Sequence, residues 1–297
     1  MTPTEFGQQT VNALSLGSIY ALVAVGLAMV FAILRLINFA HGEVVMLGAF
    51  AAYFYADWGA PFLLAAVGAI LTTVAIGVTM ERVAYRPIRG APDVALLLTS
   101  LGVSIALQNG ATLAFGATPR RFPTPGWMGE QITLGGVRIT VTNLATVLVA
   151  LGAMVVLTWI VTRTTIGIQM RAAAENLPTA QLMGINTTTV IVAAFVIGSA
   201  MAGLAAILWG ARVGRIEPLL GFIPVLKAFV ATVIGGFGSI PGAVLGAYVL
   251  GFGEIFLVAL LPNELTPYRD AFVFGALILV LLVRPQGILG STEPEKI

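Results

Sequence analysis

Nine runs of apolar residues, separated by short breaks that hold charged residues, proline or glycine, follow one another along almost the whole chain. Several runs reach the roughly 17 to 25 residues that a helix needs to cross a hydrocarbon core of about 30 Å. In lipid every backbone polar group must be bonded within the protein, so we expect helices. The runs are 11–34, 40–57, 61–80, 94–116, 143–162, 189–211, 222–237, 241–260 and 270–284.

The composition agrees with this pattern, since 58% of the residues are hydrophobic, 9% are charged and the mean hydropathy is +0.99. Soluble domains carry roughly 25% charged residues, and a membrane barrel would show weakly alternating strands instead. We therefore predict an all-α integral membrane protein, a polytopic helical bundle of about eight or nine spans that occupies residues 1–297 as one domain. The 222–237 run is short, so it spans incompletely or forms a broken helix with its neighbour.

Three properties exclude other classes. The first basic residue is Arg35, so the chain start lacks the basic region of a secretory signal peptide, and we expect the first apolar run to be retained. No cysteine is present, which excludes disulfides, thiolate metal sites and cysteine nucleophiles. The formal net charge of +2 is too small and too scattered to predict nucleic-acid binding.

The basic residues near the ends of the runs predict an orientation. With nine spans, Arg35, the three arginines of 81–93, Arg163, Arg171 and the terminal Arg284 and Lys296 fall on one side. We assign that side to the cytoplasm, which leaves the N-terminus outside. The bias is weak because six arginines fall on the other side: Arg120, Arg121, Arg138, Arg212, Arg215 and Arg269.

Two short words suggest an internal repeat. "GAFAAYF" at 48–54 aligns with "GAYVLGF" at 246–252, and Arg86-Pro87 aligns with Arg284-Pro285 at the same offset of 198 residues. The two segments would run in the same direction, as in a parallel repeat. Chance recurrence of short apolar words is the alternative.

Glycines at helical spacing predict close helix contacts. Gly238, Gly242 and Gly246 are each four residues apart, a pattern that lets helices approach closely in lipid. The contacts would lie within this chain or at a subunit interface.

Familiar enzyme signatures are missing. The only lysines, Lys227 and Lys296, do not follow the glycine that a phosphate-binding loop requires. One histidine cannot form a His-Glu-x-x-His zinc site, and no serine lies in Gly-x-Ser-x-Gly. We expect no enzyme activity, catalytic residue, metal site or bound cofactor. If ATP drives this protein, another polypeptide binds the ATP.

Two ionisable residues fall inside apolar runs, where burial is costly and mainly functional. Lys227 in "IPVLKAFVATV" stands near the end of a run, where a lysine can extend to the interface. Glu254 in "LGFGEIFLVAL" is close to mid-span. It could pair with Lys227, face a watery pathway or mark a misplaced boundary.

The stretch "INFAHGE" at 37–43 holds the only histidine, His41, between two apolar runs. Asn38 can cap the following helix, and Glu43 in its first turn suits the positive helix end. The alternative is that the break exposes helix ends along a substrate route, as discontinuous helices do in transporters. Our candidate pathway residues are therefore Asn38, His41, Glu43 and Glu254.

The polar segment "TRTTIGIQMRAAAENLPTAQLMGINTTT" at 162–189 predicts two short helical pieces on the cytoplasmic side. Ala172 to Glu175 favours a helix, Pro178 cannot continue it, and Gly184 gives a stop. The segment also carries the apolar residues Leu177, Leu182, Met183 and Ile185. A solvated loop would not need them, so we favour docking to a partner.

Five segments in order resemble one family. They are "LGSIYALVAVGLAMVFAILRLINFAHGEVVMLGAF", "ERVAYRPIRG", "RAAAENLPTAQLMGIN", "KAFVATVIGGFGSIPGAVLGAYVLG" and "LILVLLVRPQGILG". Together they are similar to the LivH-type permease of branched-chain amino-acid ABC importers. The resemblance implies a permease in the bacterial inner membrane, paired with a LivM-like permease. It also implies two cytoplasmic ATPases that bind ATP and Mg, and an extracytoplasmic substrate-binding protein.

The resemblance further implies that 163–188 couples the permease to the ATPases. The matching positions are Arg171, Ala172, Ala174, Glu175, Asn176, Leu182 and Gly184. The usual Glu-Ala-Ala signature is not matched letter for letter, because the three alanines precede Glu175.

Function is then expected to be translocation of leucine, isoleucine and valine by alternating access. A related permease for urea, short amides or other amino acids is the runner-up. A self-sufficient carrier or channel that uses Glu254 and Lys227, and a membrane scaffold without transport, are the other classes.

Overall fold

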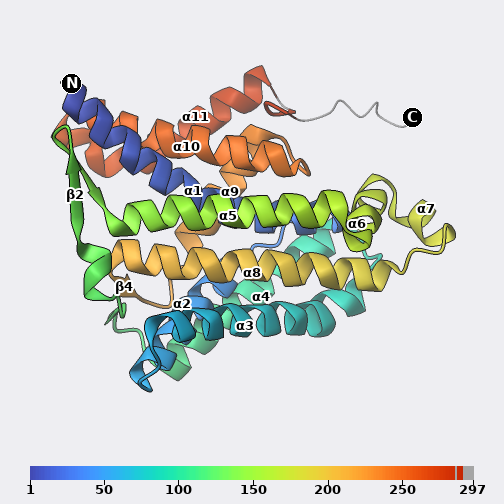
Figure 1. Cartoon of the computed structure of the whole chain (residues 1–297). Helices are drawn as coiled ribbons and strands as arrows, with labels where there is room; N and C mark the ends of the chain where they lie inside the picture. The colour runs from blue at the N-terminus through green and yellow to red at the C-terminus, as the bar shows by residue number, and fades with distance from the viewer. Residues whose placement is uncertain (285, 290–297) are drawn as a thin grey trace.

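The computed structural model describes residues 1–284 and 286–289. Long helices lie side by side in a bundle, with a β-hairpin at one end and two short helices at the other (Figure 1). We call these the hairpin end and the α7 end. The helices are α1 (Pro3–Leu34), α2 (His41–Asp57), α3 (Phe62–Met80), α4 (Asp93–Phe115), α5 (Val141–Arg163), α6 (Thr165–Glu175), α7 (Leu177–Leu182), α8 (Thr187–Val213), α9 (Phe222–Gly235), α10 (Ile240–Leu260) and α11 (Arg269–Val283).

All nine predicted apolar runs form helices, and most ends differ by only a few residues. The largest difference is at α1, which starts at Pro3 instead of residue 11. The Thr2 hydroxyl accepts a hydrogen bond from the Glu5 amide, and the Glu5 carboxylate accepts one from the Thr2 amide. This capping box, followed by proline in the first turn, starts the helix inside a polar stretch.

Six helices in the described residues are long and apolar enough to cross a membrane. Helices α2, α9 and α11 are shorter, with 17, 14 and 15 residues. Fourteen residues give a rise of about 21 Å, less than a hydrocarbon core of about 30 Å. The 222–237 run is thus a short helix, as its length predicted.

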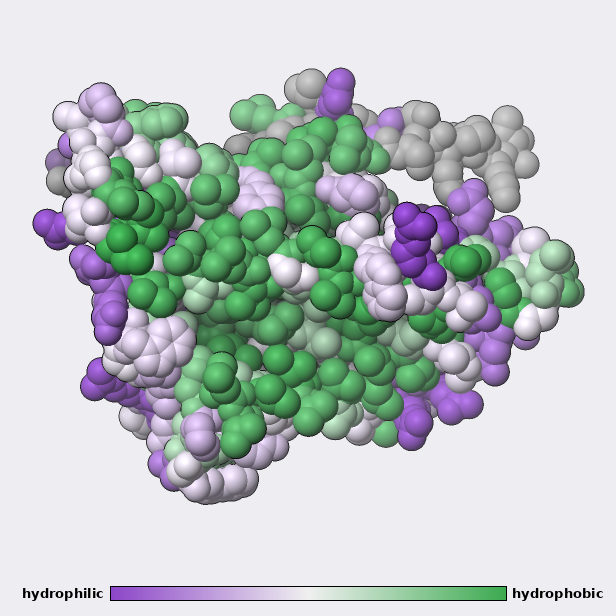
Figure 2. Space-filling model, in the orientation of Figure 1, coloured by the Kyte–Doolittle hydropathy of each residue, from purple (hydrophilic) through white to green (hydrophobic). Residues whose placement is uncertain are grey.

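Helix α1 forms the centre of the bundle and packs against α8, α9 and α10. Helices α3, α4 and α5 instead expose large apolar side chains, among them Leu71, Leu113 and Val155. Green apolar surface covers the middle of the molecule, and purple polar groups gather toward its two ends (Figure 2). An apolar belt between polar ends is the surface that a bilayer requires.

Helices α2 and α9 begin side by side inside the bundle. A Cβ atom on Gly42 would lie 2.5 Å from the Gly221 carbonyl oxygen, so neither position has room for a side chain. Gly242 and Gly246 lie on α10 against α9, where a Cβ on Gly242 would lie 2.5 Å from the Gly235 oxygen. These two contacts are therefore within the chain.

Gly238 corrects our prediction of a three-glycine helix contact. It lies in the turn before α10, which begins at Ile240, and its φ of +79° is a conformation that glycine adopts without strain. Gly238 therefore serves the turn before α10 and is not part of the helix contact.

Several short elements were not predicted. The expected break after 80 begins with a further turn of helix, η1 (Glu81–Tyr85), followed by η2 (Arg86–Ile88). Strands β2 (Gln131–Leu134) and β3 (Val137–Thr140) form the hairpin, and β1 (Arg120–Arg121) pairs with β4 (Arg215–Ile216). Another short 3-10 helix, η3 (Gly126–Gly129), precedes β2, and η4 (Asn263–Tyr268) precedes α11.

The segments of the suggested repeat lie in helices, 48–54 in α2 and 246–252 in α10. Pro285 and Lys296 lie outside the described residues. The repeat stays a prediction.

Candidate translocation and coupling sites

The start of α2 buries three polar side chains, those of Asn38, His41 and Glu43, each at most 2% exposed. Asn38 does not cap the helix, as we had expected. The N-cap is Ala40, and the Asn38 Oδ1 atom instead accepts a hydrogen bond of 2.7 Å from the Tyr85 hydroxyl. Asn38 therefore joins the start of α2 to the end of the α3–η1 helix.

Glu43 lies in the first turn of α2 and joins it to α4. The Ser104 hydroxyl donates a hydrogen bond of 3.0 Å to Glu43 Oε1, and the Phe39 amide donates one of 2.7 Å to the Ser100 hydroxyl. The carboxylate therefore lies at the positive end of its own helix and in contact with a neighbouring one.

His41 packs against Gly26 of α1, which in turn contacts Gly198 of α8. A Cβ atom on Gly26 of α1 would lie 2.5 Å from His41 Nε2 and 3.0 Å from the Gly198 oxygen of α8. Neither His41 Nε2 nor Glu43 Oε2 has a hydrogen-bond partner among the described residues. Because buried polar atoms are normally satisfied, two unpaired atoms beside one helix start mark a functional candidate.

A second buried polar group joins α9, α10 and α11. Lys227 Nζ lies 2.5 Å from Glu254 Oε1 and 3.1 Å from Asp270 Oδ1, and the Tyr20 hydroxyl donates a hydrogen bond of 2.9 Å to Glu254 Oε2. Arg269 Nε lies 4.0 Å from Glu254 Oε1. Lys227 is 2% exposed, so its side chain does not extend to the membrane interface. Among the roles that we considered for Glu254, the structure shows the pairing with Lys227.

These four charges balance one another, two positive and two negative. A buried ion is tolerated only when it is paired and hydrogen-bonded, and each member here faces an opposite charge. We call Lys227, Glu254, Arg269 and Asp270 the charge quartet. Beside it, a cavity of about 690 Å³ lies between α10 and α11, with Glu254 in its wall.

The 163–188 segment folds into the two predicted short helices, α6 and α7. Thr164 caps α6 by accepting from the Gly167 amide at 3.1 Å, and Asn176 caps α7 by accepting from the Thr179 amide at 2.9 Å. Asn176 thus ends one helix and starts the next, with Pro178 in the first turn, where proline is tolerated. Gly184 follows with a φ of +84°.

The tip of this segment is apolar and exposed. Leu182 is 88% exposed and Met183 is 79% exposed. They lie at the end of α7, which is at the far end of the molecule (Figure 1). Leu177 and Ile185 instead pack against the core. Arg171, Ala172 and Glu175 are exposed on α6, and Ala174 is half-buried.

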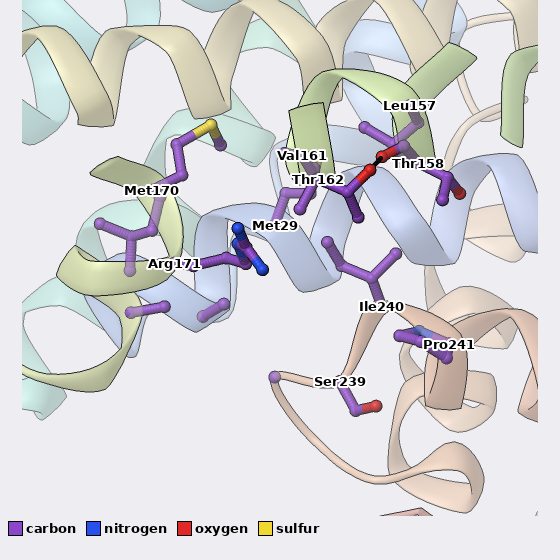
Figure 3. A pocket seen from close by; sticks show the side chains of 14 residues that line it. Met29, Leu157, Thr158, Val161, Thr162, Met170, Arg171, Ser239, Ile240 and Pro241 are labelled. Carbon is purple, nitrogen blue, oxygen red and sulfur yellow. Dashed lines mark hydrogen bonds between the residues drawn. The ribbon is translucent and has the colours of Figure 1, made fainter. Parts of the chain in front are cut away.

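Helix α6 is tied closely to α5. A Cβ atom on Gly167 would overlap the Ile160 carbonyl oxygen, so the two helices meet backbone to backbone. A cavity of about 360 Å³ lies between α1, α5, α6 and residues 238–241 at the start of α10. Figure 3 shows the Arg171 side chain pointing into it. The close contact at Gly167 thus joins α6 directly to α5.

The family model for the permease component of branched-chain amino acid transport systems matches residues 9–282. The chain belongs to this family. The permease is 42% identical to the high-affinity branched-chain amino acid transport system permease protein BraD of Pseudomonas aeruginosa, over 98% of this chain and 97% of that protein. It is 43% identical to the corresponding permease protein LivH of Escherichia coli K12, over 98% of each chain.

A solved structure supports the fold alone. The permease resembles one chain in the structure of PsaBC from Streptococcus pneumoniae in complex with Fab, with a TM-score of 0.50 and 14% identity, over 93% of this chain and 91% of that one. With its apolar helices, family membership makes the permease a multi-pass protein of the inner membrane and a transport subunit.

Sequence reasoning missed several partners in these sites. Arg269 and Asp270 carried a usable signal, since both are charged and adjoin the last apolar run. Tyr20, Tyr85 and Ser104 carried none, because their roles depend on contacts between helices far apart in the chain.

Proposed function

We propose that the chain is the permease subunit of an ATP-driven importer that translocates leucine, isoleucine and valine across the bacterial inner membrane. The observation that carries this proposal is the identity of 42–43% to BraD and LivH over nearly the whole of each chain. Both relatives are named for branched-chain amino acids.

Its partners would be a second, LivM-like permease, two cytoplasmic ATPases that hold ATP and Mg, and an extracytoplasmic substrate-binding protein. The absence of a phosphate-binding loop from the sequence supports this division of labour. The whole chain, 1–297, would form one permease domain, and 163–188 would be its cytoplasmic coupling segment. The exposed Leu182 and Met183 supply an apolar contact for an ATPase.

The α7 end would face the cytoplasm. Arg35 and Arg89 line a cleft beside α6 and α7, and Arg163 ends the helix before them. The hairpin end also carries arginines, including Arg120 and Arg138, so the bias follows the positive-inside rule only weakly.

Transport would proceed by alternating access. ATP closes the two ATPases, which displaces α6 and α7, and the tight Gly167 contact passes this displacement to α5. Asn38, His41, Glu43 and Glu254 remain our pathway candidates. The first three lie where two helices begin side by side within the bundle, a feature of discontinuous helices in transporters.

The substrate range of the complete complex tests the proposal. Proteoliposomes with all subunits and ATP should accumulate radiolabelled leucine, and excess isoleucine or valine should reduce that uptake at least severalfold. Urea and acetamide should not compete. Accumulation of urea or an amide without leucine would keep the importer and replace the substrate class.

A further inference from the structure

The cavity between α10 and α11 combines an apolar wall with one buried carboxylate. Its volume is about 690 Å³, within the roughly 300 to 1,000 Å³ of small-molecule sites. The wall is built from aliphatic and aromatic side chains that include Val249, Leu257, Phe272 and Val273. Glu254 is the only charged residue among the described residues that line it.

The charge quartet spans from the interior to the surface. The side chains of Lys227 and Glu254 are 3% and 5% exposed, whereas those of Asp270 and Arg269 are 45% and 50% exposed. From the surface inward, the order is Arg269, Asp270, Lys227 and Glu254, so positive and negative groups alternate. The last of them, Glu254, lies in the cavity wall. This arrangement presents both signs of charge beside an apolar space.

We propose that this cavity and the charge quartet form a substrate site for a zwitterionic amino acid with an aliphatic side chain, an inference that rests on the proposed function. The ammonium group of the ligand binds Glu254 and Asp270. Its carboxylate binds Lys227 and Arg269, and its side chain enters the apolar cavity.

Charge balance favours this ligand class. The ammonium group of a zwitterion can take the place of a lysine or arginine, and its carboxylate can take the place of an acidic side chain. Each buried charge therefore keeps a partner of opposite sign. Urea and amides offer neither charge, and a side chain with its own charge would meet an apolar wall. The site therefore selects for both ends of an aliphatic amino acid.

Helix α11 is the element that binding would displace. Its Asp270 contributes the weaker of the two contacts to Lys227, at 3.1 Å against 2.5 Å for Glu254. An incoming carboxylate that takes the place of Asp270 on Lys227 would release the start of α11 from α9. Substrate binding and movement of α11 are thereby coupled.

The test uses the lack of native cysteine in the chain. Gly253 and Gly275 line the cavity, and a Cβ atom on either meets no neighbouring atom within 4 Å, so Gly253→Cys and Gly275→Cys should both fold and assemble. Gly152→Cys on α5 has equally open surroundings and is the matched control. The complete complex in proteoliposomes is labelled with a small methanethiosulfonate reagent, with or without leucine.

Saturating leucine, isoleucine or valine should slow labelling of both cavity variants at least threefold, while urea and lysine leave it unchanged. Labelling of Gly152→Cys should be the same in all conditions. Equal labelling with and without leucine, in vesicles that accumulate leucine, would overturn the site and leave the proposed function intact. Absence of labelling of both cavity variants even without leucine would also overturn the site, because a partner subunit or lipid would then cover the cavity. Failure of the wild-type complex to accumulate leucine would instead reject the proposed function.

Discussion

At the scale of single residues, two buried side chains of opposite charge, Lys227 and Glu254, contact each other in the charge quartet. Lys227 and Glu254 are nearly inaccessible and lie on helices that the sequence connects by a short turn. Their pairing explains how two ionisable groups persist inside apolar runs. Removing one partner of a buried pair costs about 3 to 5 kcal/mol, mostly because the other charge is left uncompensated.

The variant Lys227→Met should therefore lower the thermal stability of the purified complex strongly. Adding Glu254→Gln should recover part of the loss, because the double variant removes both charges. Melting of the detergent-purified complex, followed by size-exclusion chromatography, measures both. A double variant that is less stable than the single one would contradict this account of the pair.

At the scale of elements, the two short helices α2 and α9 depend on contacts that allow no side chain. A Cβ on Gly221 would overlap the Gly42 carbonyl, so Gly221→Ala should destabilise the complex by about 1 to 3 kcal/mol. Gly152→Ala, which meets open space, should be neutral or slightly stabilising. Equal melting temperatures for the two variants would show that α2 and α9 do not meet as described.

The coupling segment gives the second prediction at this scale. Leu182→Arg places a charge on the exposed tip of the α6–α7 segment and should abolish ATP-dependent uptake, while membrane insertion stays normal. Leu134→Arg makes the same change at 62% exposure in β2, at the opposite end, and should transport normally. Membrane fractions and uptake assays measure the two effects. Normal uptake by Leu182→Arg would remove the docking role.

The elements also show what sequence can predict. Apolar length and breaks were enough for the nine helices and for two short helices within 163–188. The break between those two lies at Asn176, and Pro178, which we expected to end the first, lies in the first turn of the second. Apolar length and breaks were not enough for the site, because Asn38 bonds Tyr85 and Glu43 bonds Ser104 from other helices. Asn38 shows this most directly. Its position in the sequence predicted a helix cap, but its side chain accepts a hydrogen bond from Tyr85 of another helix instead.

At the scale of the whole molecule, the bundle is a permease with an apolar belt, an exposed apolar tip at Leu182 and Met183, and no phosphate-binding loop in its sequence. We propose that partner ATPases supply the energy with which this permease moves its substrate uphill. The dependence on partners is therefore the central claim.

Leucine uptake into two sets of proteoliposomes tests that claim most directly. One set holds this chain alone, and the other holds the permease pair, both ATPases and the binding protein, each with and without ATP on the ATPase side. We predict accumulation only in the complete set with ATP. Accumulation by the chain alone, or equal uptake without ATP, would contradict the account and identify a self-sufficient carrier.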